Sequence, residues 1–428
     1  MASTRHGVRI EARSAPVALL EREPELRVID AAIARAREGS GGTLAIQGPA
    51  GIGKTALLHA ARERVEEADL LSLGAAGREL EERFAFGVAR QLFEPALRAL
   101  EPAVRERVLS GGAAPAASLF GDATETVAPP DAAFALAHAL YWLTANLAEL
   151  HPLVLVVDDL QWADRPSRQT LGYLAPRLGE HPVLLAIAVR SGEVELDPFS
   201  PKDAPAEIIL PAPLSTIAVR HVVRAAVDPN ASDEFCEACH RATGGNPFLA
   251  RELALAAADE GLAGAASDLD ALGAIAPESI SRSALLRLRR LGEDPRALAR
   301  ALAVLERAGI QLTAALAHLD ESDAVDAAEA LADADILSGE LPLRFMHPIL
   351  RGAVYEDLSP AARERAHREA AEHLAERGGD PRAIASHLER SEPRGETWAV
   401  EALRAAAGEA FTRGSPEAAA RALGRALD

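Results

Sequence analysis

The chain has 428 residues, of which 49% are hydrophobic and 25% charged, the balance of a globular protein of about two to four domains. Its formal net charge of −19 argues against a whole-chain nucleic-acid binder, because polyanions are held by dense positive charge. No apolar run approaches the ~18 residues that span a bilayer. The N-terminus has no apolar signal-peptide core, so we expect a cytoplasmic protein without a membrane partner.

The first half of the chain alternates helical and strand patterns. After a tail at residues 1–17, predicted to be disordered, an amphipathic helix precedes a short strand, GTLAIQG, a glycine-rich turn and a second helix. Further strands are predicted at ADLLSLGAA, at LVLVV and at HPVLLAIAVR, with mostly helical residues at 80–150 and a softer Gly/Ala/Pro stretch at 111–131. This alternation predicts an α/β fold with a parallel sheet, which we place at residues 18–212.

The second half carries little strand signal. We expect helices at residues 213–275, and a winged-helix domain at 276–358, where short helices accompany LRFMHPILRGAV. Residues 359–428 alternate amphipathic helices with Gly or Pro breaks, as at the start of a TPR-like helical repeat array.

A phosphate-binding loop is predicted between the first strand and the second helix. The segment GPAGIGKT fits G-x-x-x-x-G-K-[ST], and it holds Lys54, one of only two lysines in the chain. Glycines let backbone N–H groups turn toward phosphate oxygens, and the helix end is positive. Lys54 would reach the β- and γ-phosphates, and Thr55 would bind Mg²⁺. The alternative is a chance glycine-rich turn. The predicted nucleotide-binding residues here are Gly48, Pro49, Ala50, Gly51, Ile52, Gly53, Lys54, Thr55 and Ala56.

Two later strands end in charged residues that suit the same site. Asp158 ends a buried strand and is predicted to hold Mg²⁺, while Asp159 would orient or deprotonate the attacking water. Arg190 ends the next strand and would sense the γ-phosphate. The structural alternatives are a capped turn for the aspartates and a surface position for the arginine. Asp164, followed by Arg-Pro-Ser, is predicted to be a helix N-cap.

The only two cysteines, Cys236 and Cys239, stand before His240 in a C-x-x-C-H pattern. This spacing occurs in haem attachment, which requires export, and two cysteines with one histidine leave a zinc site one ligand short. We therefore interpret the motif as part of a helix.

The order LLERE, GPAGIGKT, AFGVARQLFEP, VVDDLQWAD, AVR, TGGNPF and FMHPILRGAVYEDL resembles the signal-transduction ATPases with numerous domains (STAND), and among them the large ATP-binding regulators of the LuxR type. The resemblance implies an AAA+-like core, a helical lid, a winged helix and a helical-repeat sensor. It implies that Arg22 and Glu23 lie near adenine, although Glu21 stands where the family usually has glycine. Pro247 would pack on adenine as part of the lid. His347 would touch a bound diphosphate, with a buried structural histidine as the alternative.

The leading functional hypothesis is an ATP-binding switch with weak, slow ATPase activity, regulating transcription through conformational change and self-association into a homo-oligomer. ATP with Mg²⁺ would favour an open state and ADP a closed one, biased by an inducer that the sequence does not identify. Family members usually end in a helix-turn-helix domain; no terminal basic recognition helix is found here, so we expect either a fragment of a longer regulator or a stand-alone member that works through a partner. DNA would then be reached through a missing domain or through a partner.

Two other functions remain open at this stage. The arginine-rich stretch with Arg282, Arg287, Arg289 and Arg290 would suit direct DNA binding by a winged helix, as in origin-recognition ATPases, or only a solvated helix face. A housekeeping ATPase or kinase would need an acceptor pocket, for which the sequence gives no sign.

Overall fold

The computed structural model describes residues 19–82, 84–120, 132–200, 205–274, 285–334, 336–339, 341–412 and 415–427. The predicted tail at residues 1–17 lies outside this part of the chain. The chain divides into two compact units. The first, called the core unit here, comprises residues 21–212 and 399–428, and the second, the helical unit, comprises residues 213–398 with Leu20.

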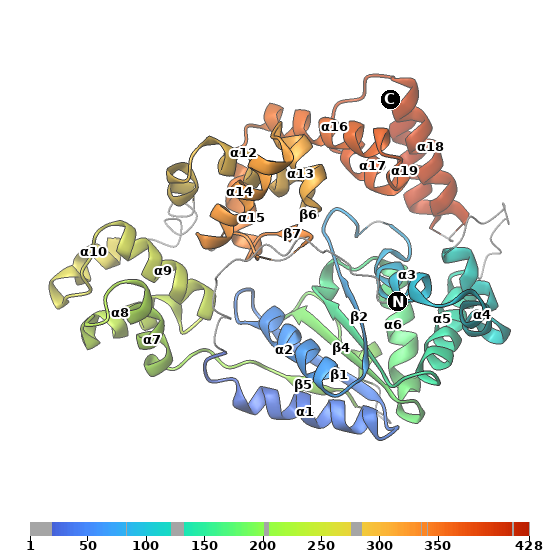
Figure 1. Cartoon of the computed structure of the whole chain (residues 1–428), viewed down its shortest axis with the longest axis horizontal. Coiled ribbons are helices and arrows are strands. Elements are labelled where there is room, and N and C mark those ends of the chain that lie inside the picture. Colours follow the sequence, from blue (N-terminus) through green and yellow to red (C-terminus); the bar gives the residue numbers. More distant parts are fainter. Residues whose placement is uncertain are drawn as a thin grey trace, which may run out of the picture. The chain divides into compact units, whose positions relative to one another are not determined.

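The core unit contains a five-stranded parallel sheet with the order β2-β3-β4-β1-β5 (Figure 1). This confirms the predicted α/β fold. Strand β5 was not predicted, because its three residues are too few to show a pattern. The strands are β1 (Gly42–Gly48), β2 (Leu71–Ala76), β3 (Leu153–Asp158), β4 (Val183–Arg190) and β5 (Glu207–Ile209).

Helices cover both faces of the sheet because strand side chains point alternately to opposite sides. Leu44 and Ile46 of β1 pack with α1 and α2, whereas Ala45 belongs to the cluster that includes α3, α5 and α6. The helical elements of this unit up to residue 212 are α1 (Glu23–Arg37), α2 (Lys54–Glu67), α3 (Gly87–Ala99), α4 (Pro102–Val108), η1 (Gly111–Leu119), α5 (Ala132–Ala148), η2 (Leu160–Trp162), α6 (Arg165–Leu174), η3 (Ala175–Glu180) and η4 (Asp197–Phe199).

The sheet brings the polar strand ends to one edge. In the register of β1 and β4, Gly48 lies beside Arg190, and β3 pairs with the other side of β4. All three strands run parallel, so the turn after β1, the two aspartates at the end of β3 and the arginine that ends β4 occupy the carboxyl edge of the sheet. In open α/β sheets this edge is where ligands bind.

The helical unit packs around two hydrophobic clusters. Apart from the two-residue antiparallel strands β6 (Arg307–Ala308) and β7 (Leu343–Arg344), its described elements are helical. Residues 285–290 form a helix as well. The others are α7 (Thr216–Ala226), α8 (Asp233–Thr243), α9 (Pro247–Asp259), η5 (Ala266–Asp268), α10 (Leu269–Ala274), α12 (Glu293–Leu305), α13 (Ile310–Ala317), α14 (Glu321–Asp333), α15 (Pro348–Asp357), α16 (Pro360–Glu376) and α17 (Pro381–Leu388).

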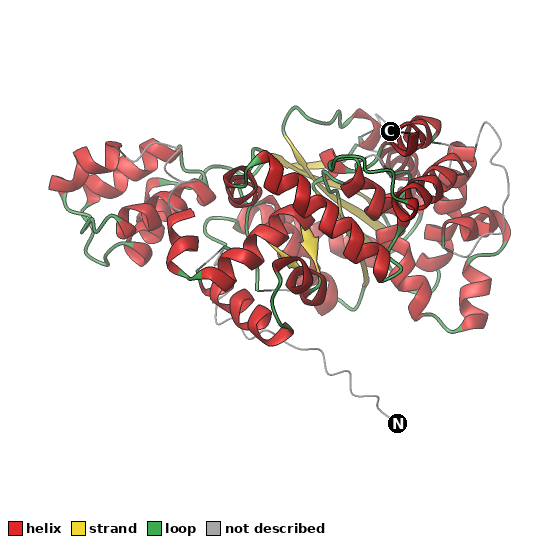
Figure 2. Cartoon of the chain, turned by 90° about the horizontal axis from the view of Figure 1, so that it is seen from above, coloured by secondary structure: helices red, strands yellow, loops and turns green. Residues whose placement is uncertain are grey.

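The C-terminal part consists of α18 (Thr397–Thr412), which crosses the unit boundary, and α19 (Pro416–Leu427). The two helices pack through alanines, so small side chains allow a close approach. Figure 2 shows the prevalence of helix outside the sheet. None of the helices in the described residues combines the length and the apolar character needed to cross a lipid bilayer.

The two cysteines lie on the buried face of α8. Both thiols are free, and both residues are 0% exposed within an apolar cluster. Burial raises the pKa of Cys239 to about 12, so the thiol stays protonated and unreactive at neutral pH. The C-x-x-C-H pattern is therefore part of a helix core, and His240 uses its Nε2 in a 3.1 Å hydrogen bond with the Leu214 carbonyl.

Candidate nucleotide-binding site

The glycine-rich turn connects β1 to α2 through a backbone that requires glycine. Gly51 and Gly53 have φ angles of 80° and 102°, in the region that glycine adopts most readily. A Cβ atom on Gly48 would come within 2.8 Å of Cγ2 of Ile52. No side chain caps α2, and its first turn holds no acidic residue. The positive end of this helix therefore suits an anionic ligand.

Lys54 lies at this helix end with its ammonium turned back toward the turn. Nζ donates hydrogen bonds to the carbonyl oxygens of Gly48 and Pro49, both at 2.9 Å, and the residue is 7% exposed. Burial lowers the pKa of Lys54, while the carboxylates of Asp159 and Asp158 oppose this effect. The carboxylates thus act on Lys54 across the carboxyl edge of the sheet.

The two aspartates differ in backbone and environment. Asp158 is the last residue of β3, and its Oδ1 accepts a 2.9 Å hydrogen bond from the backbone N–H of Asp159. Asp159 has a left-handed backbone with φ of 47°, an uncommon conformation outside glycine. Burial and the neighbouring Asp158 carboxylate raise the pKa of Asp159 to about 6. Such a raised pKa favours a group that accepts protons near neutral pH.

Gln161 connects Asp159 to the end of the next strand, a role that was not predicted from the sequence. Its Nε2 donates to Oδ1 of Asp159 at 2.6 Å, and its Oε1 accepts from the backbone N–H of Arg190 at 3.2 Å. The side chain is buried, with 5% exposure. The only sequence signal for this residue is its position directly after Asp158, Asp159 and Leu160, in the turn that follows β3.

Arg190 ends β4 beside the glycine-rich turn, as its strand position predicts. Its guanidinium lies 3.7 Å from Oε1 of Glu193 and 5.9 Å from the centre of the Trp162 ring. Its charge also contributes to the pKa of Lys54 and of Asp159. Arg190 therefore belongs electrostatically to the same site.

Arg22 supports the turn from the N-terminal side. The residue is 2% exposed, and Nη2 donates to the carbonyl of Ile52 at 3.2 Å. Glu21 has a φ of 55°, which accounts for the glycine that the resemblance leads one to expect there. Glu23 is exposed in the first turn of α1, where an acidic side chain stabilises the helix dipole.

Asp164 caps α6, as predicted, and also caps a second helix. Its Oδ1 accepts from the backbone N–H groups of Ser167 at 2.9 Å and Phe86 at 2.7 Å, and its Oδ2 accepts from Val88 at 3.2 Å. Phe86 is the N-cap residue of α3. Asp164 is therefore a buried structural carboxylate that joins the N-terminal ends of α3 and α6.

Pro247 and His347 belong to the helical unit. Pro247 is the first residue of α9, and Asn246 caps this helix by accepting from the N–H groups of Phe248 and Leu249. The imidazole of His347 stacks on the Phe248 ring with centroids 3.7 Å apart, and its Nδ1 accepts from the N–H of Ile349. Both motifs thus have a local structural role, and their contacts with nucleotide stay predictions.

Thr55 and Asp158 are the residues that fit a magnesium ion. Thr55 is partly buried in the first turn of α2. Within the described residues, no group of three or more His, Cys, Asp or Glu side chains is arranged to hold a metal by itself. Mg²⁺ in nucleotide sites typically takes one or two protein oxygens and completes its shell with phosphates and water. The donor set therefore fits a nucleotide-bound Mg²⁺ better than a protein-only site.

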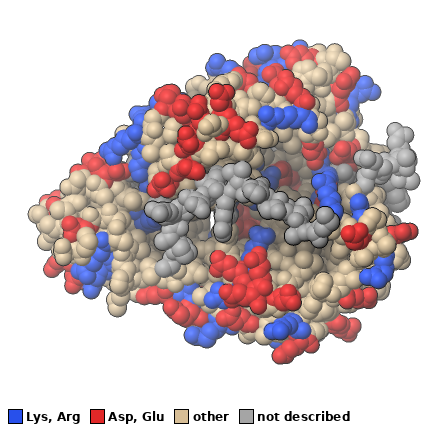
Figure 3. Space-filling model, viewed as in Figure 1, with Lys and Arg blue, Asp and Glu red and all other residues tan. Residues whose placement is uncertain are grey.

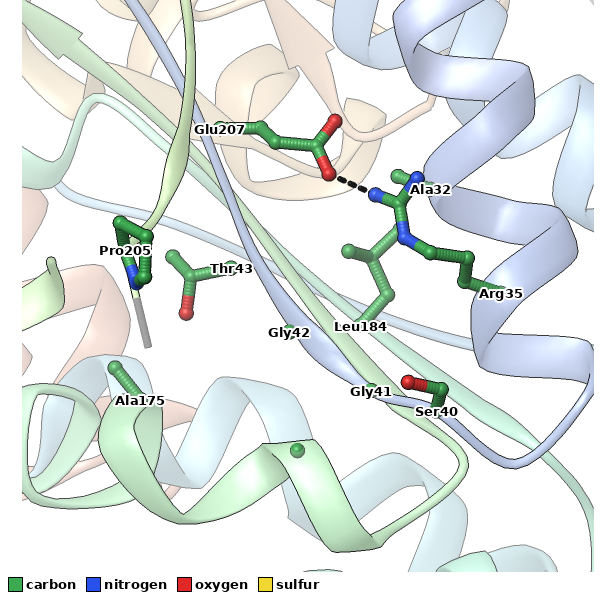
Figure 4. Close-up of a pocket in the computed structure, with 11 residues that line it drawn as sticks. Ala32, Arg35, Ser40, Gly41, Gly42, Thr43, Ala175, Leu184, Pro205 and Glu207 are labelled. Atoms are coloured by element: carbon green, nitrogen blue, oxygen red, sulfur yellow. Dashed lines mark hydrogen bonds and ion pairs between the residues drawn. The ribbon is translucent and has the colours of Figure 1, made fainter. Parts of the chain in front are cut away.

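A separate cavity of about 210 Å³ lies at the opposite, amino edge of the sheet (Figure 4). Arg35 and Glu207 beside it form an ion pair with each other. The Thr43 hydroxyl in its wall is buried without a hydrogen-bond partner. With its charges paired, this cavity offers no counterpart to the chemistry of the glycine-rich turn.

The strand order, the turn and the strand-end aspartates define a P-loop nucleoside triphosphatase fold of the AAA+ type. Residues 18–186 match the family described as AAA ATPase domain. Among solved structures, a signal-transduction ATPase with numerous domains and a tetratricopeptide repeat sensor, from Pyrococcus horikoshii, is similar with a TM-score of 0.53 and 14% identity, over 92% of this chain and 57% of that one.

A curated relative, an uncharacterized protein of Rhizobium meliloti strain 1021, is 27% identical over 87% of this chain and 39% of the relative. The chain thus spans less than two thirds of the length of either protein. These likenesses support the fold and the ATPase domain. They leave the activity of a whole protein to be proposed.

Proposed function

We propose that the chain binds adenine nucleotide with Mg²⁺ at the turn of residues 48–56 and hydrolyses ATP slowly. The observation that carries this proposal is the meeting of a buried Lys54, an uncapped helix end and two carboxylates at one edge of the sheet. A buried cation beside an anion-binding helix end fits a polyphosphate, and the carboxylates fit its metal ion.

Each residue has a part that follows from its place. Bound Mg²⁺ would neutralise phosphate charge. Lys54 would exchange its carbonyl contacts for phosphate oxygens, and Asp158 with Thr55 would hold the metal. Asp159, with its pKa raised to about 6, would orient or deprotonate water. Arg190 would place positive charge near the γ-phosphate.

We further propose that hydrolysis serves a STAND-type switch that regulates transcription, as in regulators of the LuxR type. Support comes from the motif order and from the fold shared with the Pyrococcus horikoshii protein. In this proposal residues 213–275 act as a lid with Pro247 on adenine, and residues 276–358 act as a winged helix with His347 on the diphosphate. The helices of residues 359–428 begin a TPR-like sensor, and nucleotide controls self-association.

Direct DNA binding by the arginine-rich stretch gains no support. Arg287 is 9% exposed and pairs with Glu252 at 2.7 Å, while Arg290 pairs with Asp259 at 2.7 Å and Arg289 lies 3.6 Å from Asp357. Arg282 lies outside the described residues. On the face shown in Figure 3, acidic and basic side chains are interspersed. A surface of mixed charge holds a polyanion weakly.

The test measures the affinity for ATP and ADP with and without Mg²⁺, together with the mass in solution. We expect Lys54→Ala to weaken nucleotide affinity at least about 100-fold and to abolish nucleotide-dependent association, because a buried phosphate contact is lost. Lys202→Ala, at the only other lysine, is the control and should behave as the wild type. Equal affinities in both variants would contradict the proposal.

A further inference from the structure

Gln161 occupies a position that nothing in the phosphate-loop chemistry requires, yet it bridges two parts of the site. It lies in η2, the short turn that follows Asp159, and its side chain spans from that turn to the end of β4. Both polar atoms of the amide are used inside the protein, one on a carboxylate and one on a backbone N–H. Arg168 also binds the Gln161 carbonyl at 3.2 Å, which fixes the turn from α6.

Through these two hydrogen bonds the amide holds the Asp159 carboxylate and the backbone of Arg190 in place. The 2.6 Å bond from Nε2 holds one oxygen of the Asp159 carboxylate and so fixes the orientation of this side chain. The 3.2 Å bond to the N–H of Arg190 fixes the strand end that carries the guanidinium. A buried amide with both bonds made is rigid, because breaking either bond leaves a polar atom without water.

We propose that Gln161 is a positioning residue that holds the Asp159 carboxylate and the Arg190 end of β4 in one fixed arrangement for ATP hydrolysis. The inference rests on the proposed function. Gln161 would act on turnover rather than on nucleotide affinity, because Lys54 and the glycine-rich turn do not contact its amide in the described hydrogen bonds.

The chain contains a matched control one strand away. Gln91 of α3 donates from Nε2 to Glu81 at 3.0 Å and accepts from the N–H of Ala76, the last residue of β2, at 3.2 Å. It therefore makes the same pair of bonds, to a carboxylate and a strand-end N–H. Gln91→Leu removes an equal number of hydrogen bonds, neither of which is made to Asp159 or Arg190.

The experiment compares Gln161→Leu, Gln161→Glu and Gln91→Leu. We expect Gln161→Leu to lower kcat for ATP at least about 10-fold with nucleotide affinity within about twofold, because small misplacements of reacting groups are costly. Gln161→Glu keeps the acceptor for Arg190 but loses the donor to Asp159, so it should lose as much turnover. Gln91→Leu should keep kcat within about twofold. Turnover near the wild-type value in Gln161→Glu would contradict the proposed positioning of the Asp159 carboxylate by Gln161.

Hydrogen exchange provides a readout without turnover. In Gln161→Leu the amide of Arg190 should exchange faster, and in Gln91→Leu the amide of Ala76 should do so instead. Equal kcat in the two leucine variants, or an unchanged Arg190 amide, would overturn the inference. A wild-type chain that binds nucleotide without turnover would also overturn it, whereas a wild-type chain that binds no nucleotide would refute the proposed function itself.

Discussion

A buried ion pair of the helical unit and the buried lysine of the core unit differ in what their charges contact. In the helical unit, Glu252 and Arg287 pair with each other at 2.7 Å, with 2% and 9% side-chain exposure. In the core unit, the buried ammonium of Lys54 contacts only backbone carbonyls in the described hydrogen bonds, although two carboxylates act on it from the same sheet edge. The first arrangement pairs its two opposite charges within the protein. The second is suited to a ligand that brings its own negative charge.

The largest expected effect comes from breaking the buried ion pair of Glu252 and Arg287. Glu252→Ala leaves Arg287 buried without its carboxylate, so we expect a loss of about 3–5 kcal/mol in the free energy of unfolding. Urea denaturation of the whole chain, followed by circular dichroism, measures this loss. Asp259→Ala removes the more exposed neighbouring pair with Arg290 and should cost at most about 1 kcal/mol. Similar losses in both variants would show that the buried pair is not special.

The next largest effect tests the proposed role of Asp158 in holding the Mg²⁺ ion of a bound nucleotide. Asp158→Asn should weaken the affinity for ATP with Mg²⁺ by about 100-fold, because a metal ligand is lost. Affinity for ATP without Mg²⁺ should stay the same or increase, since a negative charge is removed beside an anion. Titration calorimetry with and without Mg²⁺ measures both. Asp197→Asn, at an exposed carboxylate of the same unit, is the control. An equal loss with and without metal would contradict a metal role for Asp158.

Much of the core unit could be predicted from sequence because its signals are local. The strands at Leu153–Asp158 and Val183–Arg190 are apolar runs, and the glycine-rich turn fits a contiguous motif. The fifth strand was missed because Glu207–Ile209 is short. The hydrogen bonds of Gln161 could not be predicted from the sequence for another reason. Its partner Arg190 lies 29 residues away, and only the packed sheet shows that the two strand ends meet.

A third prediction concerns three side chains of the helical unit that are linked by hydrogen bonds. The partly buried Tyr355 and the buried His367 and His387 form a hydrogen-bonded chain, with 2.9 Å between the Tyr355 hydroxyl and Nε2 of His367 and 2.8 Å between the two Nδ1 atoms. With both rings neutral, one Nδ1 donates its proton and the other accepts it. Burial lowers the pKa of His367 to about 3 and that of His387 to about 4, with Arg390 and, for His367, also His387 and Arg351 adding to the effect.

Because the folded pKa values lie below the unfolded value of about 6.5, the unfolded chain binds more protons between pH 6.5 and 4. Stability from these rings is therefore present above pH 6.5 and is lost as the pH falls. We expect roughly 2 kcal/mol less stability at pH 5.5 than at pH 7. Urea denaturation at both pH values measures this. His387→Met should reduce the difference, and an unchanged difference in that variant would assign the pH dependence to other groups.

The smallest expected effect sharpens the contrast between the two glycine-rich helix starts. At GPAGIGKT no side chain caps α2, whereas at GGNPF the side-chain oxygen Oδ1 of Asn246 accepts from two N–H groups of α9, at 3.1 and 3.2 Å. Asn246→Ala should therefore cost about 1 kcal/mol of unfolding free energy, and Asn246→Asp, which keeps the acceptor, should restore most of it. Equal losses in both variants would mean that the side chain does not act as a cap. The second turn would then resemble the first in having N–H groups that need a ligand.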